Sequence, residues 1–148
     1  MSWRVAAAVA LAVAVTGCKA IRAPTYSSAG VTITGCPTTA QPPGRPVTLS
    51  FSVVNRSKVP WSATYLLLSP AGAMRATLTV SGAPSESIGG GITRVKSPLA
   101  RGHRVSGTIH AHLAKAASGT VNLGAWGAPA NSLSVPTSYT NPGCTLHP

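Results

Sequence analysis

Three histidines in the second half of the chain are the side chains best suited to bind a metal ion. They are His103 and the pair in His110-Ala111-His112. Alternate residues of an extended strand point to the same side, so His110 and His112 would share a face and His103 could add a third nitrogen ligand. This spacing predicts a copper or zinc site. In the alternative interpretation, both imidazoles are ordinary polar side chains on the solvent face of a strand.

Carboxylates, which most hydrolytic and metal-dependent chemistry requires, are almost absent. The chain has 12 Lys and Arg residues and one acidic residue, Glu86. Paired-carboxylate catalysis and carboxylate-rich calcium or magnesium sites are therefore excluded, and a Ser-His-Asp triad has no Asp. The run Gly89-Gly90-Gly91 is not followed by the Lys-Ser of a phosphate loop. We expect no catalytic residue and no cofactor, and the sequence predicts that the protein is not an enzyme.

The charge balance is the feature that bears most directly on partners. The formal net charge is +11 at pH 7, and such a field attracts polyanions, including anionic lipid headgroups, anionic envelope polymers and nucleic acid. We take Arg94, Lys96, Arg101 and Arg104 as the candidate polyanion contacts. A nucleic-acid groove is not favoured, because the cations are scattered and only 5% of the residues are aromatic. Net charge of one sign would also serve solubility alone.

The first residues have the layout of an export signal. The apolar run from Val5 to Val15 is too short to span a bilayer, which needs about 20 residues, and it follows a basic start. Val15-Thr16-Gly17-Cys18 then resembles the lipobox of bacterial lipoproteins. The resemblance implies a signal peptide at 1–17, a diacylglyceryl group on Cys18, a flexible tether at 18–30 and a place on the extracytoplasmic face of the cell membrane. An ordinary signal peptide that leaves Cys18 as a free thiol is the alternative.

The lipoprotein resemblance also bears on whether the remaining two cysteines form a disulfide bond. If Cys18 carries lipid, Cys36 and Cys144 are left as an even pair in an exported, oxidising setting. A bridge between them would tie the two ends of the domain together. The spacing of the two cysteines does not establish that their sulfurs meet.

Beyond residue 30 the sequence is typical of an all-β protein. Short runs rich in β-branched residues are separated by Gly and Pro, and 47–53 and 104–113 alternate apolar and polar residues. We expect further strands at 31–34, 61–68, 75–80, 92–96, 121–126 and 132–135, with an edge strand at 92–96 and a loop at 82–91. About seven such strands and no convincing helix predict a single antiparallel β-sandwich over 31–148.

Three segments carry a second resemblance. They are PPGRPVTLSFSVVNRSKVPWSATYLLLSPAG, SPLARGHRVSGTIHAHL and SGTVNLGAW, and over about 41–128 they resemble bacterial immunoglobulin-like extracellular modules of the adhesion-related and conserved-repeat type. The matching positions are Gly44, Asn55, Leu99 with Gly102, and Gly119. The resemblance implies an immunoglobulin-like sandwich that binds a partner or has a structural role. The adhesion repeats are commonly acidic and arranged in tandem, whereas this chain is basic and single.

These observations favour a monomeric, membrane-anchored lipoprotein that contacts another envelope component, a polymer or a protein, through a basic surface. Two alternatives stay open. One is a copper- or zinc-handling lipoprotein that uses His103, His110 and His112. The other is a secreted lipoprotein that acts as an interference factor or effector by surface contact.

Overall fold

The computed structural model describes residues 29–128, 135–136 and 138–148. The predicted signal peptide, Cys18 and nearly all of the predicted tether lie outside these residues. Nine strands occur in the described part of the chain, which contains no helix long and apolar enough to cross a membrane. In chain order they are β1 (Ala29–Thr34), β2 (Val47–Asn55), β3 (Ala63–Gly72), β4 (Met74–Ser81), β5 (Ser85–Gly89), β6 (Ile92–Val95), β7 (Arg104–Leu113), β8 (Gly119–Ala128) and β9 (Gly143–Leu146).

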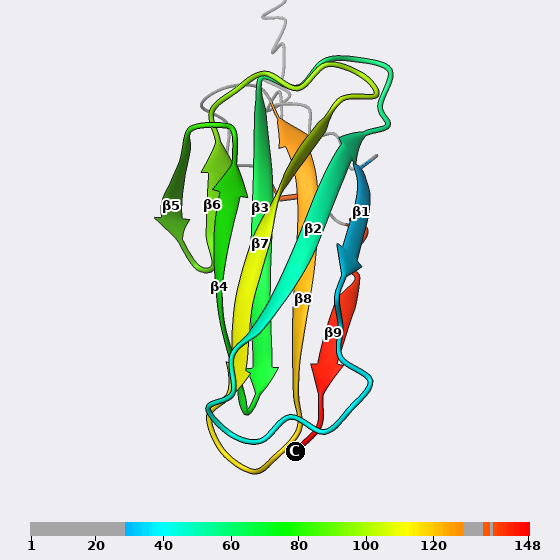
Figure 1. Cartoon of the computed structure of the whole chain (residues 1–148). Helices are drawn as coiled ribbons and strands as arrows, with labels where there is room; N and C mark the ends of the chain where they lie inside the picture. Colours follow the sequence, from blue (N-terminus) through cyan, green and yellow to red (C-terminus); the bar gives the residue numbers. More distant parts are fainter. Residues whose placement is uncertain (1–28, 129–134, 137) are drawn as a thin grey trace, which may run out of the picture.

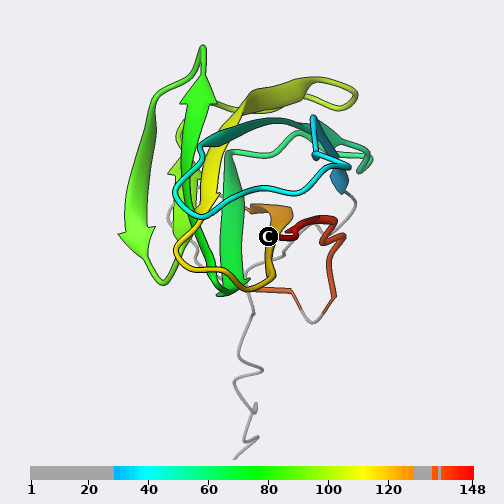
Figure 2. The same ribbon diagram turned by 60° about the horizontal axis from the view of Figure 1, so that its bottom comes forward.

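The strands form two antiparallel sheets packed face to face, which confirms the predicted all-β sandwich. One sheet has the order β1-β2-β7-β4 and the other the order β5-β6-β3-β8-β9. In Figure 1 the strands of both sheets run along the long axis of the molecule, with one sheet in front of the other. Figure 2 shows the same two sheets from nearer the end at which the chain terminates. The strands run between two ends of the sandwich, so each connecting loop belongs to one end or the other.

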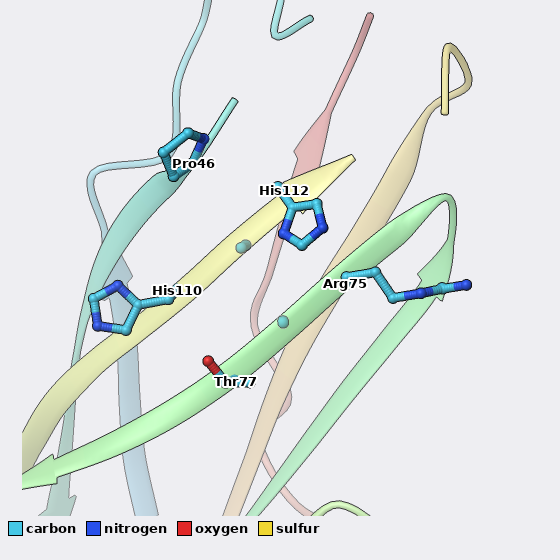
Figure 3. Close-up of a pocket in the computed structure, with 7 residues that line it drawn as sticks. Pro46, Arg75, Thr77, His110 and His112 are labelled. Atoms are coloured by element: carbon cyan, nitrogen blue, oxygen red, sulfur yellow. The ribbon is translucent and has the colours of Figure 1, made fainter. Parts of the chain in front are cut away.

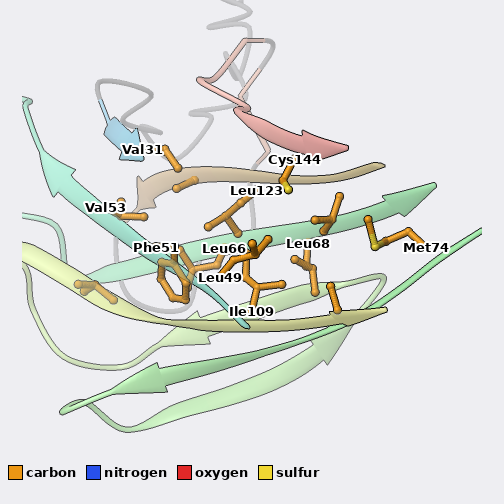
Figure 4. Packing of buried hydrophobic residues seen from close by; sticks show 14 of the residues in the cluster. Val31, Leu49, Phe51, Val53, Leu66, Leu68, Met74, Ile109, Leu123 and Cys144 are labelled. Carbon is orange, nitrogen blue, oxygen red and sulfur yellow. The ribbon is translucent and has the colours of Figure 1, made fainter. Parts of the chain in front are cut away.

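The core lies between the sheets and follows from the alternation in the sequence. On β2 the burial pattern alternates from Val47 to Asn55, and on β7 from Arg104 to Leu113. Leu49 and Ile109 are opposite each other in neighbouring strands, and both are fully buried. They meet Leu66 and Leu123 from the other sheet (Figure 4). A continuous aliphatic layer of this kind excludes water and fixes which face of each strand is outward.

A second, smaller cluster lies on the outer face of the five-stranded sheet. Tyr65 and Trp126 are paired across β3 and β8, and their stacked rings have centroids 5.8 Å apart. The ring of Tyr139 lies 5.5 Å from that of Trp126. Tyr139 also lies directly over Gly124, where any side chain would collide with its ring. The chain before β9 therefore covers the aromatic side of this sheet, and the two sheets have outer faces of opposite character.

A buried amide fixes the end of the sandwich at which β2 stops. Asn55 is fully buried, and its Nδ2 donates hydrogen bonds to the carbonyl oxygens of Val59 and Leu99, both at 2.9 Å. Its Oδ1 accepts hydrogen bonds from the backbone N–H and the hydroxyl of Ser57. The hydroxyl of Ser57 in turn accepts a hydrogen bond from Trp61 Nε1 at 3.0 Å. The β2–β3 and β6–β7 loops are thereby joined to each other.

A disulfide bridge joins the sheets along one side. Cys36 follows β1 in the four-stranded sheet, Cys144 belongs to β9 in the five-stranded sheet, and the two are bonded with their Cα atoms 5.7 Å apart. The expected pairing of Cys36 with Cys144 is confirmed. Cys144 is buried, whereas Cys36 is exposed.

Two details of the strand prediction are wrong, and β9 was not predicted. The segment 82–91 is not simply a loop, because β5 forms within it and pairs with β6. Strand β6 is consequently not an edge strand, since β5 and β3 flank it. The last described strand is β9, which pairs with β8. The strand expected at 132–135 lies outside the described residues except for Val135, which is in no strand.

Candidate functional site

The outer face of the four-stranded sheet is lined by hydroxyl groups and cations, and we call it the hydroxyl face. Every second side chain of each strand points outward, and the outward residues of all four strands are mostly Ser and Thr. The outward hydroxyl side chains are Thr32, Thr34, Thr48, Ser50, Ser52, Thr77, Thr79, Ser81, Ser106 and Thr108. Arg75, Arg104, His110 and His112 are the charged or titratable members. Hydroxyls and cations together can bind anionic oxygens without competition from a carboxylate.

The register of the strands places the imidazoles among these groups. His110 is flanked by Thr48 on β2 and Thr77 on β4, and its ring nitrogens lie 3.4 Å from the hydroxyls of Thr48 and Thr108. His112 is directly opposite Arg75. A shallow depression of about 300 Å³ lies here, and Pro46 closes one side of it (Figure 3). In Figure 3 the guanidinium of Arg75 points away from the imidazoles, and it donates a hydrogen bond to the carbonyl of Met74 at 3.1 Å.

The structure does not bring the three predicted metal ligands together. His110 and His112 project from the same side of β7, but His103 lies seven residues before His110, in the turn that precedes the strand. At about 3.3 Å per residue that separation is roughly 23 Å. No group of three metal-binding side chains occurs in the described ranges, so the three-histidine site is not formed.

Two of the four predicted polyanion contacts are engaged within the protein. Arg94 and Lys96 both contact the carboxylate of Glu86 across the β5–β6 hairpin, with Lys96 Nζ 2.8 Å from Glu86 Oε2. Hydrogen bonds from Lys96 and then Arg94 lower the pKa of Glu86, and the bond to Glu86 raises the pKa of Arg94. Since one carboxylate is shared by two cations, this group retains a single net positive charge. It is a weaker anion site than its sequence suggests.

The other two predicted contacts belong to a cluster of exposed cations at one end of the sandwich. Arg101 and Arg104 follow β6, and the β2–β3 loop adds Arg56 and Lys58, which were not among the predicted contacts. The hydrogen bonds of Asn55 hold these two loops side by side. We call this cluster of Arg56, Lys58, Arg101 and Arg104 the basic end, drawn at the top of Figure 1.

The opposite end holds a serine–histidine contact. Ser118 Oγ and His147 Nδ1 lie 3.0 Å apart, and both residues are exposed. A hydroxyl in hydrogen-bond contact with an imidazole is the pairing used in nucleophilic catalysis. Here it also ties the residue after β9 to the β7–β8 connection.

Comparison with known proteins gives a likeness of fold. No family model and no curated protein matches the chain. A solved structure described as "AvmM Catalyzes Macrocyclization in Alchivemycin A Biosynthesis" superposes with a TM-score of 0.58 at 12% sequence identity, covering 82% of this chain and 90% of that one. At this identity the likeness concerns the fold alone.

This comparison corrects the prediction that the protein is not an enzyme. The prediction rested on the lack of carboxylates. It also rested on the expectation that an immunoglobulin-like sandwich only binds a partner or has a structural role. A chain of similar fold is described as catalysing a macrocyclization. The fold is therefore no reason to exclude catalysis, because one architecture can hold unrelated sites.

Proposed function

We propose that the protein is a lipid-anchored, extracytoplasmic β-sandwich that binds an anionic envelope polymer through its hydroxyl face. The observation that supports this most strongly is the composition of that face. Its hydroxyls, Arg75, Arg104 and the two imidazoles share one surface, and the only acidic residue of the chain, Glu86, belongs to the other sheet. Polymers that carry phosphate or carboxylate groups present repeating anionic oxygens, which such a face can contact at several points.

The strand order supports the immunoglobulin-like part of the proposal. In immunoglobulin constant domains, one sheet has the order A-B-E-D and the other contains C, F and G. In this protein the four-stranded sheet has the strand arrangement A-B-E-D, as β1-β2-β7-β4. The other sheet contains the C-F-G arrangement as β3-β8-β9, and β6 and β5 extend it beyond β3. Asn55, one of the positions of the resemblance, is the buried amide that joins two loops. A sandwich of this type presents a whole sheet face to a partner.

The cysteine pairing supports the lipid anchor. Because Cys36 and Cys144 are bonded to each other, Cys18 is the one cysteine of three that is left for modification. We expect protein recovered from membranes to have the mass of residues 18–148 plus a diacylglyceryl group. A Cys18→Ser variant should lose both the added mass and the membrane association. An uncut or unlipidated mass in the unaltered protein would contradict the anchor.

Binding of the polymer is expected to depend steeply on salt. With a glycerol-phosphate polymer as the probe, the double variant Arg75→Gln, Arg104→Gln should bind about tenfold more weakly at low salt. The logarithm of the association constant decreases linearly with the logarithm of the salt concentration, and the steepness of this decrease should be smaller by about two, since two fewer counterions are released. The measurement is a titration at several ionic strengths.

The matched control removes two cations that do not belong to the hydroxyl face. Arg45 precedes β2 and Lys115 follows β7, and both are exposed. The variant Arg45→Gln, Lys115→Gln has the same net charge as the test variant and should retain most of the affinity. Equal losses in the two variants would mean that the polymer responds to net charge and not to this face.

A further inference from the structure

The basic end lies where the described chain begins. The first residue of β1, Ala29, is paired with Asn55, the last residue of β2. Arg56 comes next in the chain and lies against β1, since a side chain added at Gly30 would meet its guanidinium. The N-terminal part of the chain therefore joins the sandwich at the same end as Arg56, Lys58, Arg101 and Arg104.

These cations are held on a rigid platform. The N–H of Asn55 donates to the carbonyl of His103 at 3.0 Å, and the N–H of Gly102 donates to the carbonyl of Asn55 at 2.7 Å. Trp61 and Leu99 exchange two further backbone hydrogen bonds across the two loops. Because the loops are joined in this way, their exposed cations are attached at the same end of the sandwich.

An exposed apolar residue follows Lys58 in the β2–β3 loop. Val59 is 39% exposed, next to Lys58 and Pro60. It is one of only two large hydrophobic residues that are exposed in the described part of the chain. An apolar side chain among cations suits the boundary between lipid headgroups and acyl chains, where both kinds of contact are favourable.

We propose that the basic end docks onto the anionic lipid headgroups of the membrane that holds the Cys18 anchor; this inference rests on the lipid anchor of the proposed function. Eleven residue steps separate Cys18 from Ala29, so the two lie at most about 40 Å apart. Confinement within that distance gives the basic end an effective concentration at the surface of millimolar order. A weak intrinsic affinity for anionic lipid is then sufficient to keep the end docked.

Docking in this way sets the orientation of the whole sandwich. The strands run from the basic end to the opposite end, so they would stand away from the membrane surface. Apart from Arg104 at the docked end, the hydroxyl face would then be presented sideways and stay open to a polymer, with Arg75 and His112 at its distal part. One molecule could bind lipid and polymer at the same time.

The test uses the mature chain with Cys18→Ser, so that no lipid anchor contributes to binding. We would measure its sedimentation with vesicles of phosphatidylcholine containing about 30% phosphatidylglycerol, and with phosphatidylcholine alone. The triple variant Arg56→Gln, Lys58→Gln, Arg101→Gln is expected to bind the anionic vesicles about a hundredfold more weakly. The control triple Arg45→Gln, Arg75→Gln, Lys115→Gln has the same net charge and should lose less than about fivefold. Neither the parent nor the variants should bind phosphatidylcholine alone.

A tryptophan at the tip of the β2–β3 loop gives a second measurement that does not depend on charge removal. Trp61 and Trp126 are fully buried, so Val59→Trp would supply the responsive fluorophore. Its emission should shift to the blue when anionic vesicles are added. Equal losses in the two triple variants, or no blue shift with bound vesicles, would overturn the proposal. If the lipid anchor is absent, the intact mass of the membrane-recovered protein will show it. If the protein does not bind the polymer, the salt titration will show it. Both results are therefore distinguishable from a failure of the basic end to dock on lipid.

Discussion

Removal of the Cys36–Cys144 disulfide is expected to lower the free energy of unfolding by about 4.7 kcal/mol, the value that chain-entropy models give for a closed loop of roughly 100 residues. The bridge joins residues 108 positions apart and encloses β2 to β8. The unfolded chain regains most of its freedom when the bridge is absent, whereas the folded chain keeps the same hydrogen bonds. For a domain of this size, whose whole stability is of order 5–15 kcal/mol, the loss is large.

The measurement is urea unfolding of the oxidised and the reduced protein, followed by tryptophan fluorescence. Cys18→Ser is used as the background so that no third thiol can exchange. The variant Cys36→Ser, Cys144→Ala should match the reduced protein to within about 1 kcal/mol, because Cys144 is buried and a small apolar side chain can replace it. A reduced protein that loses less than about 1 kcal/mol would show that the bridge is not a main source of stability.

The second large effect is expected at Asn55. Replacement by Ala should lower the free energy of unfolding by about 3 kcal/mol or more, since buried partners that lose a hydrogen bond cost about 1–3 kcal/mol each. The carbonyl oxygens of Val59 and Leu99 would lose their donor, and Ser57 would lose its acceptor. Because these contacts join the two loops of the basic end, its arrangement should loosen as well.

Asn122→Ala is the matched control for this substitution. Asn122 is half-buried on β8, and its Nδ2 donates one long hydrogen bond, 3.3 Å, to the carbonyl of Asn141. The same chemical change at this site should alter the free energy of unfolding by less than about 1 kcal/mol. Comparable losses at both positions in urea unfolding would contradict the special role of Asn55.

The main strands could be predicted because their burial follows from local alternation. Segments 47–53 and 104–113 have the period of two that a half-buried strand requires, and β2 and β7 contain them. Strand β5 could not be predicted in this way. Its sequence SESIG lacks β-branched enrichment, and it is a strand because it pairs with β6, where Glu86 meets Arg94. Tertiary pairing overrides a weak local preference in such a case.

The candidate site was predicted only in part, since its members come together through register and loop contacts. Alternation put His110 and His112 on one face, but nothing local indicated that Arg75 would be opposite His112. The sequence likewise did not reveal that Arg94 and Lys96 share Glu86, or that Arg56 and Lys58 join Arg101. The Thr-x-Thr pattern of Thr77 and Thr79 was a usable signal for a hydroxyl-lined face, once combined with the alternating Ser and Thr of β2.

The place of the disulfide in the chain has a mechanical consequence. A pull on the N-terminal chain reaches the sandwich at Ala29, where β1 and β2 are paired at the end from which the force is applied. A pull from that end acts along β1, so it loads the hydrogen bonds between β1 and β2 together, in shear. If these bonds break, Cys36 limits the released length to seven residues, an extension of roughly 25 Å at about 3.5 Å per residue. Beyond that point the load passes through the covalent bridge into β9. A molecule anchored at its N-terminus and pulled through a bound polymer would yield by one short strand and then hold.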